Sequence, residues 1–202
     1  MGSLIEKIRK EQIVNATIMT IAENGYLRTS LEDIARDAGI SKGIISYYFK
    51  NKDGLICGVI DRIMEDLQNE ILKKAAAEET CMDKIAAGIS ANFGYMAENR
   101  QAIVAFVDLW SSISTKNDKR DFNARVYDKC IGFFERLVVE GVKNGEFVHV
   151  DSGLTASIIQ AAIDGIMIQW IFNEHSVDLR RAAEGVIEMA GKLLCWRQYP
   201  GQ

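Results

Sequence analysis

The chain has 202 residues, of which 48% are hydrophobic and 26% charged, as in an ordinary globular protein. No run of about 18 apolar residues is free of charge, which argues against a membrane-spanning segment. The four cysteines and two histidines are scattered and form no CxxC pair. We therefore expect no metal site, no cofactor and no disulfide framework, and the reducing cytoplasm is the expected location.

The net charge of −4 does not by itself suggest a nucleic-acid partner, but its distribution is uneven. Residues 1–54 contain 8 Lys/Arg and 7 Asp/Glu, a balance of +1, and the remainder contains 16 and 21, a balance of −5. This small asymmetry has the sign expected of an N-terminal part that faces DNA.

Apolar residues recur with a helical period through nearly the whole chain, and the single proline, Pro200, stands at its C-terminal end. We therefore predict an all-α fold of about nine helices. The predicted ranges are 5–24, 31–38, 42–49, 52–74, 82–98, 100–113, 119–143, 151–173 and 178–196. Predicted stops are Gly25, Gly39 and the Asn144-Gly145 pair, and predicted N-caps are Ser30, Ser41 and Asn51.

The segment 31–49 predicts two short helices around a tight turn, which is the arrangement of a helix-turn-helix. Ala35 is small where the helices must cross, and Gly39 permits the turn. The spacing of the apolar residues turns one face inward: Ile34, Ile40, Ile45 and Phe49. The polar face that remains can enter a major groove, and it consists of Lys42, Gly43, Ser46 and Tyr47. Such a helix pair also occurs in helical domains that bind no DNA.

Flanking residues extend this candidate DNA surface. Lys52 stands at the N-terminus of the 52–74 helix, where a lysine is unfavourable for the helix dipole unless a phosphate completes that end. Thr29 or Ser30 has the same expected role at the 31–38 helix. The hydroxyls of Tyr47 and Tyr48 can reach phosphates.

Taken together, residues 8–60 resemble the TetR family of one-component regulators. The resemblance rests on Ala22–Tyr26 (AENGY), 29–31 (TSL), 38–43 (AGISKG) and 47–53 (YYFKNKD). The stretch from Gly43 to Phe49 is similar to the choline-responsive betaine-pathway repressors, which does not fix the effector. The resemblance implies a three-helix DNA-binding domain in 1–54 and a ligand-binding and dimerisation domain in 55–202, connected by the 52–74 helix. It also implies a homodimer that binds an inverted repeat of double-stranded DNA as a repressor released by a small molecule. Many relatives have His where Tyr48 stands, so that contact differs here.

The last two helices carry the predicted dimer interface. The 151–173 helix is apolar almost all round, so it needs cover on more than one side. The 178–196 helix adds an apolar stripe close to coiled-coil spacing, and two such helices from each chain would form a four-helix interface. The interface residues we predict are Ile159, Ala162, Ile166, Ala182, Val186, Met189 and Leu193. The alternative is that both helices serve only the core of a monomer.

Large aromatic and methionine side chains on the four helices between 82 and 173 are candidates for an effector pocket. They are Phe93, Met96, Phe106, Trp110, Phe134, Leu137, Met167 and Trp170. Each also makes an ordinary core residue. Trp110 and Trp170 suit a cation, and Asp108, Asp164 or Glu135 would add negative charge.

Two other functions remain open on the sequence. An enzyme is disfavoured, because the chain has no Walker loop, nucleophile elbow or dinucleotide fingerprint. Its histidines, His149 and His175, fall near predicted helix ends. A dimeric DNA-binding protein without an effector is the second alternative.

Overall fold

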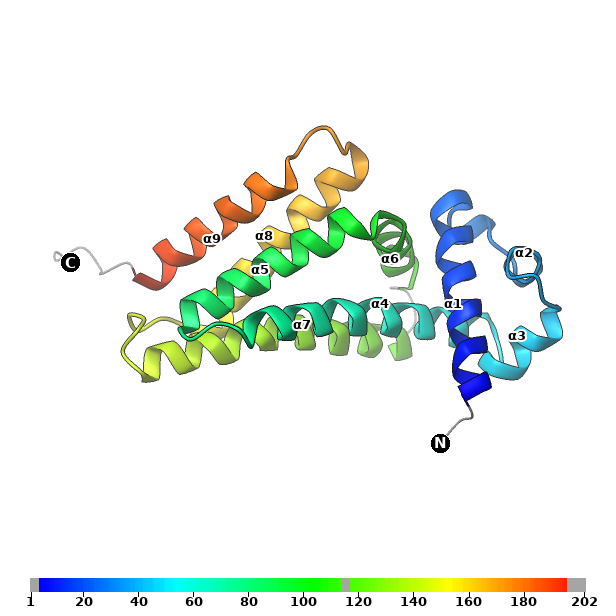
Figure 1. Ribbon diagram of the computed structural model, residues 1–202, viewed down its shortest axis with the longest axis horizontal. Helices are drawn as coiled ribbons and strands as arrows, with labels where there is room; N and C mark the ends of the chain where they lie inside the picture. The colour runs from blue at the N-terminus through cyan, green and yellow to red at the C-terminus, as the bar shows by residue number, and fades with distance from the viewer. Residues whose placement is uncertain (1–3, 114–116, 196–202) are drawn as a thin grey trace. The chain divides into compact units, whose positions relative to one another are not determined.

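The structure is a computed structural model that describes residues 4–113 and 117–195, with side chains for 4–110 and 127–195. All of its regular elements are helical, so the predicted all-α fold is confirmed (Figure 1). The elements are α1 (Leu4–Asn24), the short 3₁₀ helix η1 (Tyr26–Arg28), α2 (Leu31–Asp37), α3 (Lys42–Phe49), α4 (Lys52–Ala75), α5 (Cys81–Glu98), α6 (Arg100–Ile113), α7 (Asn117–Lys143), α8 (Ser152–Phe172) and α9 (Leu179–Cys195). The sequence pattern did not predict η1.

The chain divides into two compact units. The head unit comprises residues 1–66 and 99–120, and the body unit comprises 67–98 and 121–202. The helix α6 therefore belongs with the head, although more than thirty residues of α4 and α5 separate it from the rest of that unit. The predicted domain boundary at residue 54 stays a prediction about function, because compactness alone does not test it.

In the head unit, α1 packs against both α2 and α6, and α2 packs against α3. The core consists of fully covered aliphatic side chains, among them Ile13, Ile21, Ile34, Ile45, Leu55 and Leu109. The side-chain amide of Gln12 on α1 donates to the carbonyl of Ala38 at 2.7 Å, which ties the end of α2 to α1. These contacts hold α2 and α3 in a fixed arrangement on α1.

Local interactions define both ends of α2 and the start of α4, whereas the predicted N-cap of α3, Ser41, makes no side-chain cap hydrogen bond. Ser30 and Asp33 form a reciprocal capping box at the start of α2, which confirms the predicted N-cap. Gly39 has φ +66°, the left-handed conformation that ends α2. The side chain of Asn51 accepts a hydrogen bond from the amide of Gly54 at 2.8 Å and so caps α4. A Cβ at Gly54 would lie 2.4 Å from the carbonyl oxygen of Phe49, so this tight turn requires glycine.

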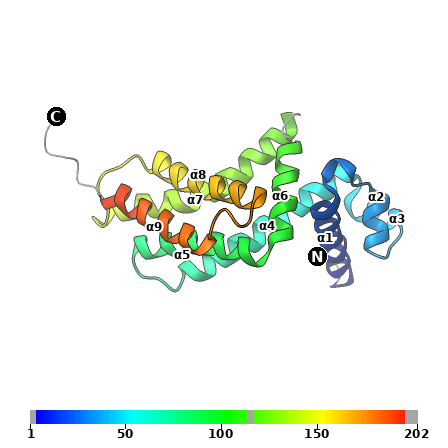
Figure 2. The same cartoon turned by 90° about the horizontal axis from the view of Figure 1, so that it is seen from above.

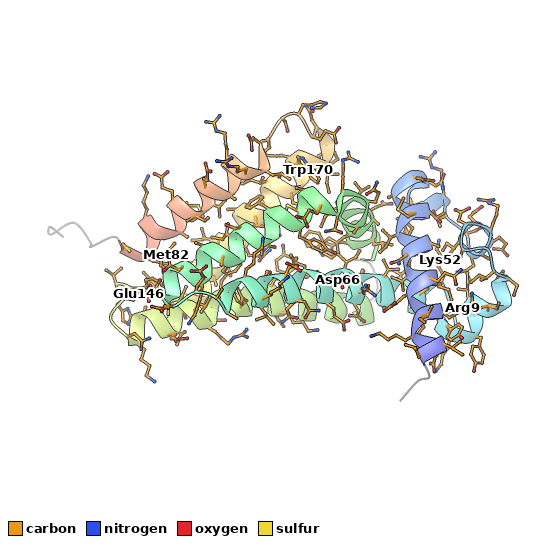
Figure 3. All side chains as sticks on the ribbon, viewed as in Figure 1. Arg9, Lys52, Asp66, Met82, Glu146 and Trp170 are labelled. Carbon is orange, nitrogen blue, oxygen red and sulfur yellow. The ribbon has the colours of Figure 1, made fainter. Side chains whose placement is uncertain are left out.

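In the body unit, α5 packs against α9, and α8 packs against both. Figures 1 and 2 show these three helices running alongside one another. Glu146, in the turn after α7, accepts hydrogen bonds from the amides of Cys81 (2.9 Å) and Met82 (2.7 Å), the first residues of α5 (Figure 3). One carboxylate thus satisfies two donors that a helix N-terminus leaves without intrahelical partners.

Candidate functional site

The helix α3 presents the polar face that the sequence predicts. Lys42, Gly43, Ser46 and Tyr47 are all exposed, whereas Ile45 on the opposite side is 1% exposed. Tyr47 is 80% exposed, which is unusual for a large aromatic side chain without a partner surface. A Cβ at Gly43 would meet only the Ser41 hydroxyl, at 3.8 Å, so the backbone is open to a partner at this position. The predicted exposure is confirmed, and the contact of these residues with DNA stays a prediction.

Lys42, the cationic residue of this face, forms an ion pair. The Lys42 ammonium lies 2.6 Å from a carboxylate oxygen of Glu32 on α2, and both side chains are largely exposed. The hydrogen bond from Lys42 lowers the pKa of Glu32, so this carboxylate is ionised at neutral pH. Sequence reasoning did not single out Glu32, although its place one position after Leu31 puts it near the N-terminus of the neighbouring helix. In the free protein, Glu32 therefore holds the ammonium of Lys42.

The side chains of Thr29 and Ser30 form hydrogen bonds within the head unit. Thr29 is 3% exposed, and its hydroxyl donates to the carbonyl of Gly25 at 2.8 Å. The hydroxyl of Ser30 bonds the side chain of Asp33 at 2.5 Å in the capping box. The geometry therefore does not support the predicted contact of the Thr29 side chain with a phosphate. The hydroxyl of Ser30 would have to leave its cap to make one.

Lys52 also has partners inside the head. Its ammonium lies 2.5 Å from the carbonyl of Thr29 and 3.3 Å from that of Tyr26, and 4.4 Å from the centre of the Tyr26 ring. Burial lowers the pKa of Lys52. This lysine links the start of α4 to η1. The sequence did not predict this role because it did not predict η1. Any phosphate contact at Lys52 comes in addition to this role.

The two tyrosines of α3 differ in exposure. Tyr48 is half-buried and meets the exposed ring of Tyr47 edge to face, with 5.0 Å between centroids. Immediately after α3, Lys50 is exposed and has φ +58°, a conformation that an L residue rarely adopts. Lys50 thus adds an exposed lysine at the C-terminal end of α3. Lys50 is an additional candidate for phosphate contact that the sequence pattern alone did not reveal.

The helix α6 is joined to the head by a charged contact. A carboxylate oxygen of Asp108 accepts a hydrogen bond from the amide of Tyr26 at 2.5 Å. Tyr26 begins η1, and the ring of Tyr26 is the one that lies under Lys52. Asp108 and Lys52 therefore hold η1 from its two ends. This use removes Asp108 from the carboxylates that we considered for a bound cation.

The predicted pocket residues fall into two groups. Phe93, Met96, Phe134, Leu137, Met167 and Trp170 belong to the body unit and are buried there. Phe106 and Trp110 belong to the head unit, where their rings stack with centroids 6.0 Å apart. Trp110 and Trp170, which the sequence suggested as a pair for a cation, thus belong to different units. Whether any of these residues lines an effector pocket stays a prediction.

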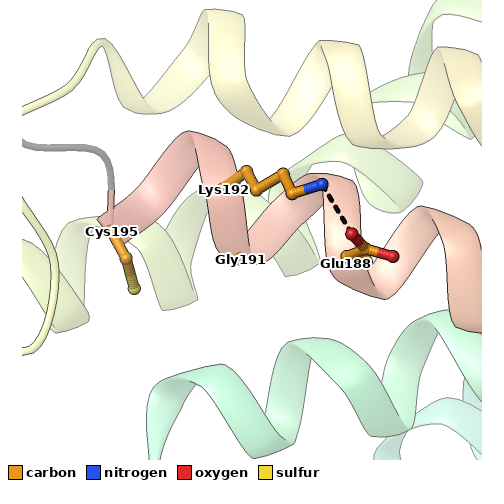
Figure 4. A pocket seen from close by; sticks show the side chains of 4 residues that line it. All are labelled: Glu188, Gly191, Lys192 and Cys195. Carbon is orange, nitrogen blue, oxygen red and sulfur yellow. Dashed lines mark hydrogen bonds and ion pairs between the residues drawn. The ribbon is translucent and has the colours of Figure 1, made fainter.

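Two hollows of the body unit have residues of α9 in their walls. One, of about 320 Å³, lies between α5 and α9 and includes Phe93 among its lining residues. The other, of about 690 Å³, lies at the end of α9, where Glu188, Gly191, Lys192 and Cys195 line it (Figure 4). Lys192 and Glu188 form an ion pair at 2.5 Å on its wall. Apart from Phe93, no residue of the predicted pocket lines either hollow.

Comparisons with known proteins agree with this architecture. Residues 13–57 match the family described as bacterial regulatory proteins, tetR family, and residues 68–194 match the BetI-type transcriptional repressor, C-terminal family. The chain belongs to the TetR family. It is 29% identical over 184 residues to the fatty acid metabolism regulator protein of Bacillus subtilis, covering 88% of this chain and 91% of that protein. It is 32% identical to the HTH-type transcriptional regulator BetI of Cronobacter sakazakii, covering 88% of this chain and 87% of that protein.

Two solved structures of transcriptional regulators have the same fold. The FadR transcriptional regulator of Bacillus subtilis in complex with stearoyl-CoA is 25% identical, with a TM-score of 0.80 over 89% of this chain and 96% of that one. A regulator from Saccharomonospora viridis in complex with choline is 18% identical, with a TM-score of 0.83 over 95% of this chain and all of that one. This TetR-family chain is therefore a DNA-binding transcription regulator with a helix-turn-helix, and it is not an enzyme.

The predicted dimer residues of this TetR-family chain lie at different depths. Ile159 and Val186 are 0% and 4% exposed, because the rest of the body unit covers them. Ala162, Ile166, Ala182, Met189 and Leu193 are half-buried. The side of α8 that lies open instead carries Leu154 (60% exposed), Ile158 (37%) and Ala161. Ile159 and Val186 are thus core residues of the single chain.

The described residues contain no group of three His, Cys, Asp or Glu placed to hold a metal ion. All four cysteines are free thiols.

Proposed function

We propose that this TetR-family chain is a repressor that binds an inverted-repeat operator as a homodimer in the cytoplasm and leaves it when a small molecule binds the BetI-type domain. The observation that carries the DNA part is the exposed polar face of α3, with Tyr47 at 80% exposure and the backbone of Gly43 open to a partner. The DNA contacts we propose are Lys42, Gly43, Ser46, Tyr47 and Tyr48, together with Lys50.

The proposal of a dimer rests on α8. Its open side is apolar, with Leu154 and Ile158 exposed, and Gly165 leaves space in which nothing comes within 4 Å of a Cβ. By length and composition, α8 is also the one helix in the described ranges that would suit a membrane crossing, and core helices of soluble proteins pass that same test. Asp164 stands in its middle, which favours a protein partner over lipid. A second copy of α8 and α9 covers this side in a two-fold arrangement.

The relatives support control by an effector. The B. subtilis FadR structure contains stearoyl-CoA, and the family of residues 68–194 is named for a repressor. The chain offers a route for such control, because α4 runs from the head unit into the body unit without interruption. Tilting α4 would change the separation of the two α3 helices in a dimer, which must match half-sites about 34 Å apart or a multiple of that spacing.

The test is a fluorescence anisotropy titration of the full chain against duplex DNA taken from upstream of its own gene. We expect saturable binding to an inverted repeat, two chains per duplex, and a steep loss of affinity with added salt. A metabolite library is then screened for a compound that releases the complex. If the protein binds the duplex but no compound releases it, we would conclude that it is a dimeric DNA-binding protein without an effector. Failure to bind any duplex at low ionic strength would contradict the whole proposal.

A further inference from the structure

A hollow of about 470 Å³ opens on the head unit, where residues of α1, α4 and the end of α3 line it. Every described residue in its walls belongs to 1–66, so the hollow is separate from the BetI-type domain. None of the proposed DNA contacts lines it. Its volume falls within the range of small-molecule sites, about 300–1,000 Å³. The head unit thus has space for a ligand of its own.

Two apolar side chains line this hollow. Val14 on α1 is 5% exposed, and the ring of Phe49, the last residue of α3, is half-buried. Beside that ring α4 carries a glycine, Gly58, at which a Cβ would lie 3.0 Å from Cε1 of Phe49. The glycine therefore lets the ring lie directly against the backbone of α4. An apolar part of a ligand that covers Val14 and Phe49 would be removed from water.

The charged side chains of the hollow have an excess of positive charge. Two lysines and an arginine line it, but only two carboxylates, those of Glu6 and Glu11. Lys10 pairs with Glu6 at 3.1 Å, and Arg62 pairs with Glu11 at 3.4 Å. Lys7 is exposed and has no ion-pair partner among the described residues. An anion that enters the hollow is therefore attracted, and a cation is not.

Among these cations, Arg62 has the geometry to hold a carboxylate. Its side chain is half-buried, its Nε donates to Asp66 at 2.8 Å, and its Nη1 lies 3.4 Å from Glu11. These close contacts use Nε and Nη1, and they leave the N–H groups of Nη2 for a further acceptor. The contact with Glu11 is longer than a charge-assisted hydrogen bond of about 2.7–2.9 Å, so a carboxylate that enters the hollow can replace it. A planar guanidinium binds a carboxylate through two parallel hydrogen bonds.

We propose that this hollow of the head unit binds a small organic carboxylate, whose charged end is held by Arg62 and whose apolar part packs on Val14 and Phe49. The inference goes beyond the proposed function, because the site lies in the head unit and does not depend on an effector in the BetI-type domain. A phenyl ring or a short alkyl chain has the chemistry that the two apolar side chains favour. The bound carboxylate contacts α3 directly, at its last residue.

Methyl NMR of the full chain with isotope-labelled valine measures binding and locates the probe. The probes are phenylacetate and octanoate, with phenylacetamide as the neutral isostere and inorganic phosphate as an anion without an apolar part. We expect at least one carboxylate to shift the signals of Val14, which Val14→Ile assigns, and to leave those of Val139 on α7 unchanged. Phenylacetamide and phosphate should bind at least about tenfold more weakly than that carboxylate. No shift at Val14, shifts confined to the body unit, or equal binding of either control compound would each overturn the proposal.

The variant Arg62→Gln removes the guanidinium, and we expect it to bind the carboxylate about 10- to 100-fold more weakly. The matched control is Arg36→Gln on α2, because Arg36 also pairs with two carboxylates, Asp33 and Asp37, each at 3.2 Å, and lies outside the hollow. Exposed ion pairs contribute little to stability, so both variants should fold, which thermal denaturation checks. Equal affinity of the two variants for the carboxylate would overturn the proposal.

The variant Glu11→Gln tests the same contact with the opposite sign. It frees Nη1 of Arg62, so the carboxylate should bind about two- to fivefold more tightly. Glu23→Gln, which removes an exposed carboxylate of α1 outside the hollow, shows the effect of net charge alone. This comparison keeps the arginine and therefore decides even if Arg62→Gln does not fold. Binding to Glu11→Gln that is no tighter than binding to Glu23→Gln would mean that Arg62 is not the anchor, and would overturn the proposal.

Discussion

The polar face of α3 carries a glycine, Gly43, at a position where the free protein has no need of one. It lies in the first turn of the helix, with negative φ, and a Cβ there would touch only Ser41 at 3.8 Å. Glycine within a helix is costly compared with alanine. A residue that weakens the helix and fills no space in the free protein is best explained by a partner that comes close to the backbone.

We therefore predict opposite effects of Gly43→Ala on folding and on DNA binding. The free energy of unfolding should rise by about 0.5–1 kcal/mol, because alanine is the better helix former. Operator affinity should fall roughly tenfold, since the methyl group occupies the space of the DNA. Urea denaturation and fluorescence anisotropy measure the two effects. Gly132→Ala on α7 is the control, with open space for a Cβ up to Arg136 at 3.7 Å, and should leave operator affinity unchanged. Undiminished affinity in Gly43→Ala would mean that DNA does not approach this backbone.

The Glu32–Lys42 ion pair leads to a second prediction at this scale. In Glu32→Gln the ammonium of Lys42 loses its partner at 2.6 Å and becomes available to the DNA. Exposed ion pairs are weak, so operator affinity should rise by about two- to fivefold. Glu23→Gln, which removes an exposed carboxylate from α1, controls for net charge. If both variants strengthen binding equally, the effect is one of overall charge and Glu32 does not hold Lys42 away from DNA.

At the scale of elements, the sequence pattern predicted the positions of the helices well. It predicted the contacts of their polar side chains less well. Helix limits agreed to within a few residues because apolar periodicity, Gly25, Gly39 and Gly145 are local signals. The short helix η1 carried no such signal, since it depends on Asp108 from α6 and Lys52 from α4. The burial of Thr29 and the internal contacts of Lys52 followed from that helix. Long-range partners therefore decided which polar residues of the head remain available to DNA.

The start of α5 is another element that depends on a distant residue. The carboxylate of Glu146 accepts from the amides of Cys81 and Met82 across more than sixty residues of sequence. Glu146→Ala should lower the free energy of unfolding by about 1–2 kcal/mol, as loss of a helix cap does. Thermal and urea denaturation of the body measure this, with Glu78→Ala, an exposed acid in the preceding turn, as the control. A change no larger than that of the control would show that Thr80, which caps Asp83 at 3.0 Å, suffices to hold this helix end.

For the whole molecule, association is predicted to depend on the open side of α8. Ile158→Asp places a charge on the apolar surface that we assign to the dimer, so the protein should become monomeric and lose most of its operator affinity. Val139→Asp changes an apolar residue of similar exposure on α7 and should remain dimeric. Sedimentation velocity distinguishes the two. A dimeric Ile158→Asp would place the interface elsewhere.

Stability of the whole molecule should also depend on pH through Asp164. Burial raises the pKa of this carboxyl above its usual 3.8, so the folded state takes up its proton more readily than the unfolded state. Its contribution to stability is complete below that usual value and is lost as the pH rises through the folded pKa. Compared with Asp164→Asn, the unchanged protein should therefore lose stability as the pH rises above about 4. Urea titrations at several pH values measure this difference in the free energy of unfolding. A constant difference across this range would contradict the assignment.

The packing of α6 on α1 has a practical meaning for the design of hybrid biosensors. The simplest way to exchange the DNA-binding domain between two regulators is to transfer one continuous N-terminal segment. Here a fragment that stops at residue 66 would leave bare the side of α1 that α6 covers, and would strip η1 of its Asp108 contact. A transplant that keeps this reader intact must carry 99–113 along with 4–66, so the graft needs two inserts.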